Sequence, residues 1–220
     1  MSGGVGGVSS FGGPSAAAPI SGGQLTPEGM MLYCASQMRF LDEGIAQHMA
    51  KQQQAHSIAG LLNDLKTELG KSSMDGNDAN AKGRVLDAFD AAFKALPPGD
   101  TAMRDKLNDA FHEFVTDAYC HDDHALGNSY NLGYMGPDQR AALNEQASLN
   151  LEGNRVSGDD LKRYSTAIDA LSTDLGKGAE LDMINLQSLV SQRQMAVQLT
   201  TQIISKINDG YMAIAGQIGK

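Results

Sequence analysis

The sequence predicts an all-α protein: two long terminal helices form an antiparallel coiled-coil hairpin, with a small, mainly helical domain inserted between them and a disordered N-terminus. Apolar residues recur at alternating spacings of three and four along both terminal segments. Met is frequent (11 residues), aromatic residues make up 5% and Trp is absent, a composition that suits helix packing better than a sheet. Breaks in the pattern predict four regions: 1–25, 26–70, 71–175 and 176–220.

Residues 1–25 form a leader of low complexity. They include eight Gly and five Ser, the first charged residue of the chain is Glu28, and the first basic residue is Arg39. A Sec-type signal needs a basic region followed by a compact apolar run, and the leader has neither. We therefore expect a flexible tail that is disordered in the free protein. No stretch reaches the roughly 18 apolar residues of a membrane span, so no direct membrane insertion is expected.

The first long helix is predicted to begin with Thr26 as N-cap and Pro27 at the first helical position. A heptad seam then continues past residue 60, with polar residues His48 and Gln52 in its middle. Such residues commonly fix register and partner number. A metal or pH-sensing role for His48 is the weaker alternative, since no carboxylate lies one turn away on the same helix. The interface residues predicted from this seam are Met31, Met38, Leu41, Ile45 and Leu62.

The second long helix is predicted to follow a break at Gly176 and Gly178. Its seam is interrupted by Arg193 and Thr200, and further apolar residues beside the seam give a face broad enough for more than one neighbour. The apolar pattern continues almost to the last residue, which suggests burial against another subunit. The interface residues predicted here are Leu186, Val190, Val197, Ile204, Ile207, Tyr211, Ile214 and Ile218.

The opposite face of this second helix is polar but nearly uncharged. An ordinary exposed helix carries many Glu and Lys residues. The face therefore either packs on another subunit, lines a passage, or is a neutral solvated surface. The residues that represent it are Gln187, Gln194, Gln198 and Gln202.

The middle region is predicted to contain short amphipathic helices. One carries Phe89 and Phe93 and ends before Pro97; the next starts at Asp100 or Thr101. Four of the six Phe residues fall in these two helices, so we expect them to form the hydrophobic centre of the inserted domain. Two further helices are expected from 137 to about 149 and from 157 to about 175.

Several functional classes are disfavoured. The net charge of −9 and pI of about 4.9 argue against a nucleic-acid partner. No Gly-x-Ser-x-Gly, complete P-loop or His-Glu-x-x-His motif occurs, so we expect neither an enzyme nor a cofactor. The cluster Cys120-His121-Asp122-Asp123-His124 could bind zinc or copper. Because no second Cys/His pair lies 12–20 residues away, we predict no metal site. Cys34 is expected to be a buried free thiol.

The leader, the long N-terminal helix, the variable middle and the C-terminal heptad helix together resemble the EspA and SseB family. These proteins are filament and needle-tip subunits of bacterial type III secretion systems. The best-matching stretch is 158–220, including Leu186-Gln187-Ser188-Leu189 and the apolar ending from Ala213 to Lys220. A looser match covers 30–69, so the resemblance spans about half of the chain.

The resemblance implies a structural subunit of the extracellular filament or needle-tip complex. Such a subunit would self-assemble through its terminal helices into a hollow conduit that delivers effectors and translocators to host cells. It implies export through residues 1–25, location on a bacterial surface appendage, and a cytoplasmic stage with a secretion chaperone. The implied partners are other copies of the chain, the needle subunit and translocator proteins. The alternative is a monomeric helical chaperone or regulator of the same system. Residues 71–136 depart from the family pattern in their Phe-bearing helices, which leaves the host-facing surface open.

Overall fold

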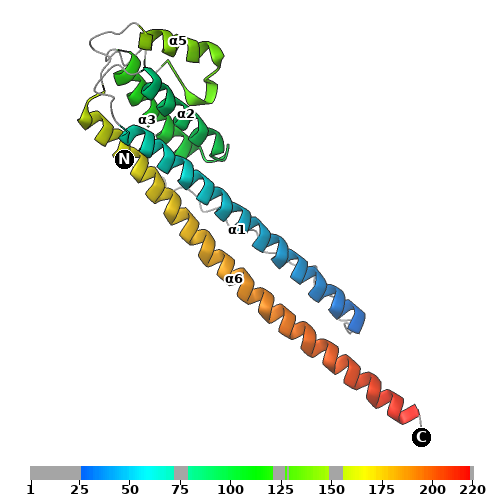
Figure 1. Cartoon of the computed structure of the whole chain (residues 1–220). Helices are drawn as coiled ribbons and strands as arrows, with labels where there is room; N and C mark the ends of the chain where they lie inside the picture. The colour runs from blue at the N-terminus through cyan, green and yellow to red at the C-terminus, as the bar shows by residue number, and fades with distance from the viewer. Residues whose placement is uncertain (1–25, 72–78, 121–126, 128, 149–155, 219–220) are drawn as a thin grey trace, which may run out of the picture. The chain divides into compact units, whose positions relative to one another are not determined.

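A computed structural model of the chain describes residues 26–71, 79–120, 127, 129–148 and 156–218 (Figure 1). Every regular element in these ranges is helical, which confirms the predicted all-α class and its long C-terminal helix. The leader 1–25 lies outside the described residues, and the coiled-coil hairpin stays a prediction. The elements are α1 (Pro27–Gly70), α2 (Ala79–Ala95), α3 (Thr101–Tyr119), η1 (Leu132–Tyr134), α5 (Pro137–Ser148) and α6 (Gly158–Ile218).

Side-chain caps set the starts of the helices, as the sequence predicts. The Thr26 hydroxyl accepts a hydrogen bond of 3.2 Å from the Gly29 N–H at the start of α1. At the start of α3, the Asp100 carboxylate accepts from the Met103 N–H at 3.2 Å. Before α6, the Asp160 N–H donates to the Ser157 hydroxyl at 3.2 Å while the Ser157 N–H donates to Asp160 at 3.0 Å. This reciprocal pair is a capping box.

The predicted break at Gly176 and Gly178 is wrong. Helix α6 continues through both residues as one element of 61 residues, so the separate helix expected to end near 175 does not end there. A glycine inside a helix costs only about 1 kcal/mol, and Leu171 and Leu186 maintain the helical apolar spacing on either side. A Cβ atom at either glycine would meet no atom within 4 Å. Neither position therefore needs glycine for steric reasons.

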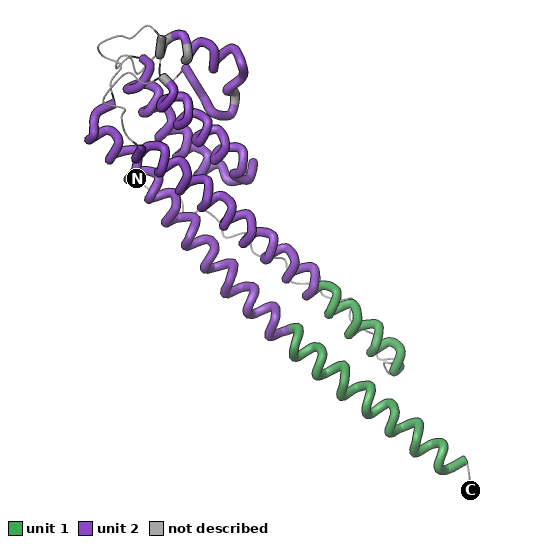
Figure 2. The backbone as a smooth tube through the Cα atoms, viewed as in Figure 1, with its two compact units in different colours: residues 1–40, 193–220 green, residues 41–192 purple. Residues whose placement is uncertain are grey.

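The chain divides into two compact units (Figure 2), unit 1 with residues 1–40 and 193–220 and unit 2 with residues 41–192. Helices α1 and α6 each contribute residues to both. Unit 2 holds a large core, in which the rings of Phe89 and Phe111 meet edge-on with centroids 5.6 Å apart. Phe114 contacts Tyr164 in the same way at 5.8 Å. The predicted hydrophobic centre of the Phe-bearing helices is thus confirmed.

Within unit 2, α1 and α6 lie side by side and antiparallel (Figure 1). Lys66 of α1 contacts Asp169 of α6 at 2.7 Å, and a Cβ atom at Gly44 would lie 3.3 Å from a Leu189 methyl group. Positions that increase along α1 therefore meet positions that decrease along α6. The missing side chain at Gly44 lets Leu189 come close to the α1 backbone.

Unit 1 combines the first turns of α1 with the last turns of α6. Cys34 is buried, with 5% of its surface exposed, and is a free thiol as predicted. Met30 of α1 and Ile207 of α6 line the same groove, so the two helices are neighbours here as well. The α6 segment continues past the start of α1 (Figure 2). The described α6 residues after Ile214 do not line this groove.

Candidate functional site

Most of the residues predicted for the seam of α1 lie on the face of this helix that is buried in the structure. Leu41 and Leu62 are buried, at 6% and 1% exposed, and Met38 and Ile45 are partly buried. Met31, near the start of the helix, is 46% exposed. The apolar spacing in the sequence therefore identified the buried stripe of α1 along most of its length.

The seam predicted on α6 is rotated relative to the stripe that α1 covers. In unit 1 the partly buried α6 residues are Ala196, Thr200, Ile203 and Ile207. Of the interface residues predicted from the sequence, only Ile207 in unit 1 and Leu186 in unit 2 are partly buried; Thr200 was predicted as an interruption of the seam. The others are exposed, among them Val190, Val197, Tyr211, Ile214 and Ile218. The covered stripe thus combines the small side chains of Ala196 and Thr200 with Ile203 and Ile207.

The free stripe on α6 in unit 1, called the outer column here, consists of Val197, Ile204, Tyr211 and Ile218. Their exposed fractions are 39%, 50%, 58% and 80%. The residues are seven positions apart, so they lie on one face of the helix. In unit 2 the same spacing places Met183 and Val190 on α6, also exposed. These exposed apolar side chains form a regular column, which is the kind of surface that can mediate contact with another protein.

The polar face of α6 is exposed, consistent with each of the three explanations that the sequence left open. The side chains of Gln187, Gln194, Gln198 and Gln202 are all exposed. Apart from Lys206 and Asp209, the exposed polar side chains of α6 between residues 194 and 218 are amides and hydroxyls. This surface is thus close to neutral.

A groove of about 460 Å³ lies in unit 1 at the start of α1. It is almost entirely apolar, and the Lys206 side chain contributes its one charged group. A Cβ atom at Gly210 would meet nothing within 4 Å, so the groove is open at this position. Its lining residues are Pro27 and Met30 of α1 and Ile203, Lys206, Ile207, Gly210, Tyr211 and Ile214 of α6.

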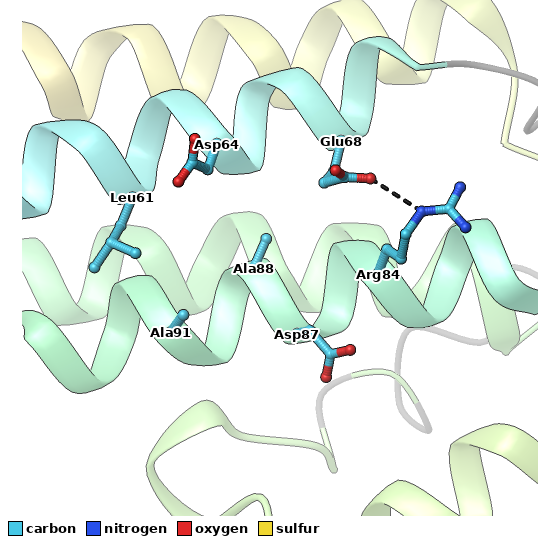
Figure 3. A pocket seen from close by; sticks show the side chains of 7 residues that line it. All are labelled: Leu61, Asp64, Glu68, Arg84, Asp87, Ala88 and Ala91. Carbon is cyan, nitrogen blue, oxygen red and sulfur yellow. Dashed lines mark hydrogen bonds and ion pairs between the residues drawn. The ribbon is translucent and has the colours of Figure 1, made fainter.

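A second, smaller groove of about 300 Å³ lies in unit 2 between α1 and α2 (Figure 3). Lys71 and then Arg84, both bonded to Glu68, lower the pKa of this carboxyl group; the Arg84 contact measures 3.1 Å. Asp87 pairs with Arg140. Glu68, Arg84 and Asp87 thus form ion pairs, and Leu61, Asp64 and two alanines complete the lining. The Glu68–Arg84 contact joins α1 to α2.

His48 is buried at 6% exposure and pairs with Asp182 of α6, with 3.0 Å between Nδ1 and Oδ1. Asp182 lies on the neighbouring helix and not one turn away on α1, so local spacing in the sequence does not reveal this partner. The seam position of His48 was predicted correctly. A carboxylate on the antiparallel neighbour can be found only with the register of the two helices.

A buried lysine was also missed from the sequence. Lys82 of α2 is fully buried, and its amine donates a 2.7 Å hydrogen bond to the Ala118 carbonyl near the C-terminal end of α3. Burial lowers the pKa of Lys82 to about 8. Lys82 lies three residues before Val85 and four before Leu86, which places it on the apolar face of α2. This spacing is the signal in the sequence that Lys82 is buried.

The predicted absence of a metal site stays a prediction for the cluster after α3. Cys120 is buried and caps α3, with its N–H donating to the Thr116 carbonyl at 3.1 Å. His121, Asp122, Asp123 and His124 lie outside the described residues. Among those that are described, no three His, Cys, Asp or Glu side chains are placed to hold a metal ion. Over the same residues, no helix is long and apolar enough to cross a membrane.

Comparisons with protein-family models, with curated proteins and with solved structures find no match for this chain.

Proposed function

We propose that this chain is a self-assembling structural subunit. Helices α1 and α6 pair as an antiparallel coiled-coil hairpin, and the outer column of α6 docks on other copies of the chain. In its more specific form, following the family resemblance, the assembly is the filament or needle tip of a type III secretion system. It would be secreted, would form a conduit for effectors and translocators, and would contact the needle subunit, translocator proteins and a cytoplasmic chaperone.

The observation that carries the proposal is the outer column. In unit 1, α1 packs on the α6 stripe that contains Ala196 and Thr200, whereas the larger Ile204 and Tyr211 remain at least half exposed. Regular seven-residue spacing is the pattern that another helix recognises. A single hairpin leaves this column uncovered, and a second copy of the chain would cover it.

The energy available is sufficient for association. Full burial of one aliphatic side chain contributes about 1.5–3 kcal/mol, and the four residues of the outer column keep from two fifths to four fifths of their surface exposed. Their burial would therefore contribute a few kcal/mol per copy, before the cost of association. Repeated along a polymer, contacts of this strength give assembly that depends steeply on protein concentration.

The neutral face of α6 supports the conduit form of the proposal. A passage for unfolded polypeptides should bind neither acidic nor basic segments strongly. Exposed amides such as Gln194 and Gln198 offer hydrogen bonds but no net charge. The same face is compatible with packing on another subunit.

Replacement of Ile204 by Asp tests the proposal. A charge in the outer column would have to be buried without a partner on assembly, so we expect the apparent dissociation constant of the oligomer to rise at least about tenfold. Sedimentation velocity over a range of concentrations and negative-stain electron microscopy measure this. The matched control is Ser205→Asp, which adds the same charge one residue along on the polar, exposed side of α6.

Two outcomes would contradict the proposal. If Ile204→Asp forms normal oligomers or filaments, the outer column is not the assembly surface. If the unmodified protein stays a discrete monomer at all concentrations, the alternative of a monomeric chaperone or regulator is favoured. Circular dichroism of each variant checks that the helices are intact.

A further inference from the structure

The groove in unit 1 lies where the chain enters α1. Thr26 caps the helix, with its carbonyl accepting a 3.0 Å hydrogen bond from the Met30 N–H, and both Pro27 and Met30 line the groove. On the α6 side, Tyr211 and Ile214 also line it and are 58% and 56% exposed. The groove is thus an apolar surface on α6 that begins at the first turn of α1 and is open to solvent.

The residues before Thr26 have the sequence that would fill it. Leu25 immediately precedes the N-cap, and Met30 is the fourth residue of the helix. A hydrophobic residue before the cap commonly packs against the fourth helical residue and fixes the angle at which the chain enters. Because Met30 lines the groove, this contact would place the Leu25 side chain at its edge. Ile20 lies five residues further upstream.

We propose that residues 20–25 dock in this groove of their own chain, with the side chains of Leu25 and Ile20 against Ile207 and Ile214. Six extended residues span roughly 20 Å, and the α6 lining from Ile203 to Ile214 spans roughly 17 Å at 1.5 Å per residue. The open position at Gly210 provides space for one of the two aliphatic side chains. The inference goes beyond the proposed function, because it needs only a single chain.

Tethering and charge both favour the leader over a second copy as the occupant. A segment joined directly to the edge of a site has an effective concentration of the order of millimolar, which a separate molecule does not reach under ordinary conditions. The leader carries no charged side chain, and the groove offers one, Lys206. The long stem of Lys206 can cover apolar surface while its amine stays in water. No ionic group would have to be buried.

The test is a pair of double-cysteine variants of the full chain. Leu25→Cys is combined with Gly210→Cys in the groove, or with Gly216→Cys as the matched control. Gly216 is a helical glycine of α6 with open space around it, and it is not among the lining residues. Disulfide formation needs Cα atoms within about 4.4–6.8 Å. We expect the 25/210 pair to close an intramolecular disulfide at least about tenfold faster than the 25/216 pair.

Mass spectrometry and non-reducing gels distinguish the possible occupants. A monomer that has lost two hydrogens in the 25/210 variant supports docking of the chain's own leader. A covalent dimer through the same cysteines shows that a second copy occupies the groove, and equal rates for both pairs show no docking; either result overturns the proposal. If Ile204→Asp still forms normal oligomers, the proposed assembly surface is wrong, but the intramolecular disulfide is unaffected. The two proposals can therefore fail independently of each other.

A second measurement uses the unmodified protein, in case the cysteine variants fold poorly. Methyl NMR should show contacts between Leu25 or Ile20 and the methyl groups of Ile207 or Ile214. These contacts should disappear in Leu25→Asp and persist in Gln24→Asp, a substitution at the adjacent polar residue. Absence of the contacts in the unmodified monomer also overturns the proposal.

Discussion

The two units of this molecule differ in how completely their apolar residues are buried. In unit 2, Leu65, Phe89, Phe111, Phe114 and Leu143 have no exposed surface. In unit 1, Cys34 is the one fully buried apolar residue among those that the structure describes, and most of the aliphatic residues at the end of α6 are exposed. Unit 2 can therefore be stable by its own packing. Under the proposed function, contacts with other copies of the chain would cover the exposed apolar residues of unit 1.

The largest expected effect breaks the core of unit 2. Phe114→Ala should lower the free energy of unfolding by about 3–5 kcal/mol, because it removes a fully buried ring and leaves a cavity. Urea unfolding followed by circular dichroism measures the change. The matched variant in unit 1 is Phe40→Ala, whose ring is 52% exposed. We expect Phe40→Ala to cost less than about 1 kcal/mol, and equal losses would contradict the contrast between the units.

The next effect concerns Lys82, whose pKa burial lowers from its ordinary value of 10.5 to about 8. Below pH 8 the amine is protonated in both states, and the folded protein bears the cost of the buried charge. Between pH 8 and pH 10.5 the unfolded chain binds more protons at Lys82 than the folded protein does. The free energy of unfolding therefore rises with pH over this range. Relative to Lys82→Met, the unmodified protein should gain about 2 kcal/mol between pH of about 7.5 and 9.5.

Urea unfolding at several pH values measures this difference. Lys94→Met is the matched control, because the Lys94 side chain is 72% exposed. Remaining below a pH of about 9.5 avoids Tyr119 and Tyr164, since burial raises the pKa of both phenols. A constant difference between the unmodified protein and Lys82→Met over this range would show that the buried amine does not titrate in it.

The smallest effect concerns the contact of α1 with α6 in unit 2. A double-mutant cycle with His48→Ala and Asp182→Ala should give a coupling free energy of about 0.5–1 kcal/mol, because the pair is hydrogen-bonded and only partly shielded from water. Denaturant unfolding at one fixed pH supplies the four free energies. A cycle with His56→Ala, an exposed histidine of the same helix, should give no coupling to Asp182. Zero coupling for His48 would leave apolar packing as the source of stability there.

The sequence predicted the elements that depend on local signals. Caps at Thr26, Asp100 and Ser157 fix where helices begin, and the spacing of Leu41 and Leu62 fixes the buried stripe of α1. The face of α6 that α1 covers could not be predicted in this way, because several adjacent columns of that helix are apolar. Which column α1 covers depends on how the two helices pack on each other, and the apolar pattern of α6 alone does not encode this. The His48–Asp182 contact depends on helix register, which no local pattern encodes.

The burial of Lys82 makes it a natural probe of how often the unit 2 core opens. Amine-reactive reagents acylate exposed lysines such as Lys94 quickly, whereas Lys82 is enclosed beside the Tyr119 ring, 5.5 Å from its centroid. Acylation at Lys82 must wait until α2 separates from the end of α3. The ratio of the two labelling rates, obtained from one digest by mass spectrometry, then gives the fraction of time that this part of the protein is open.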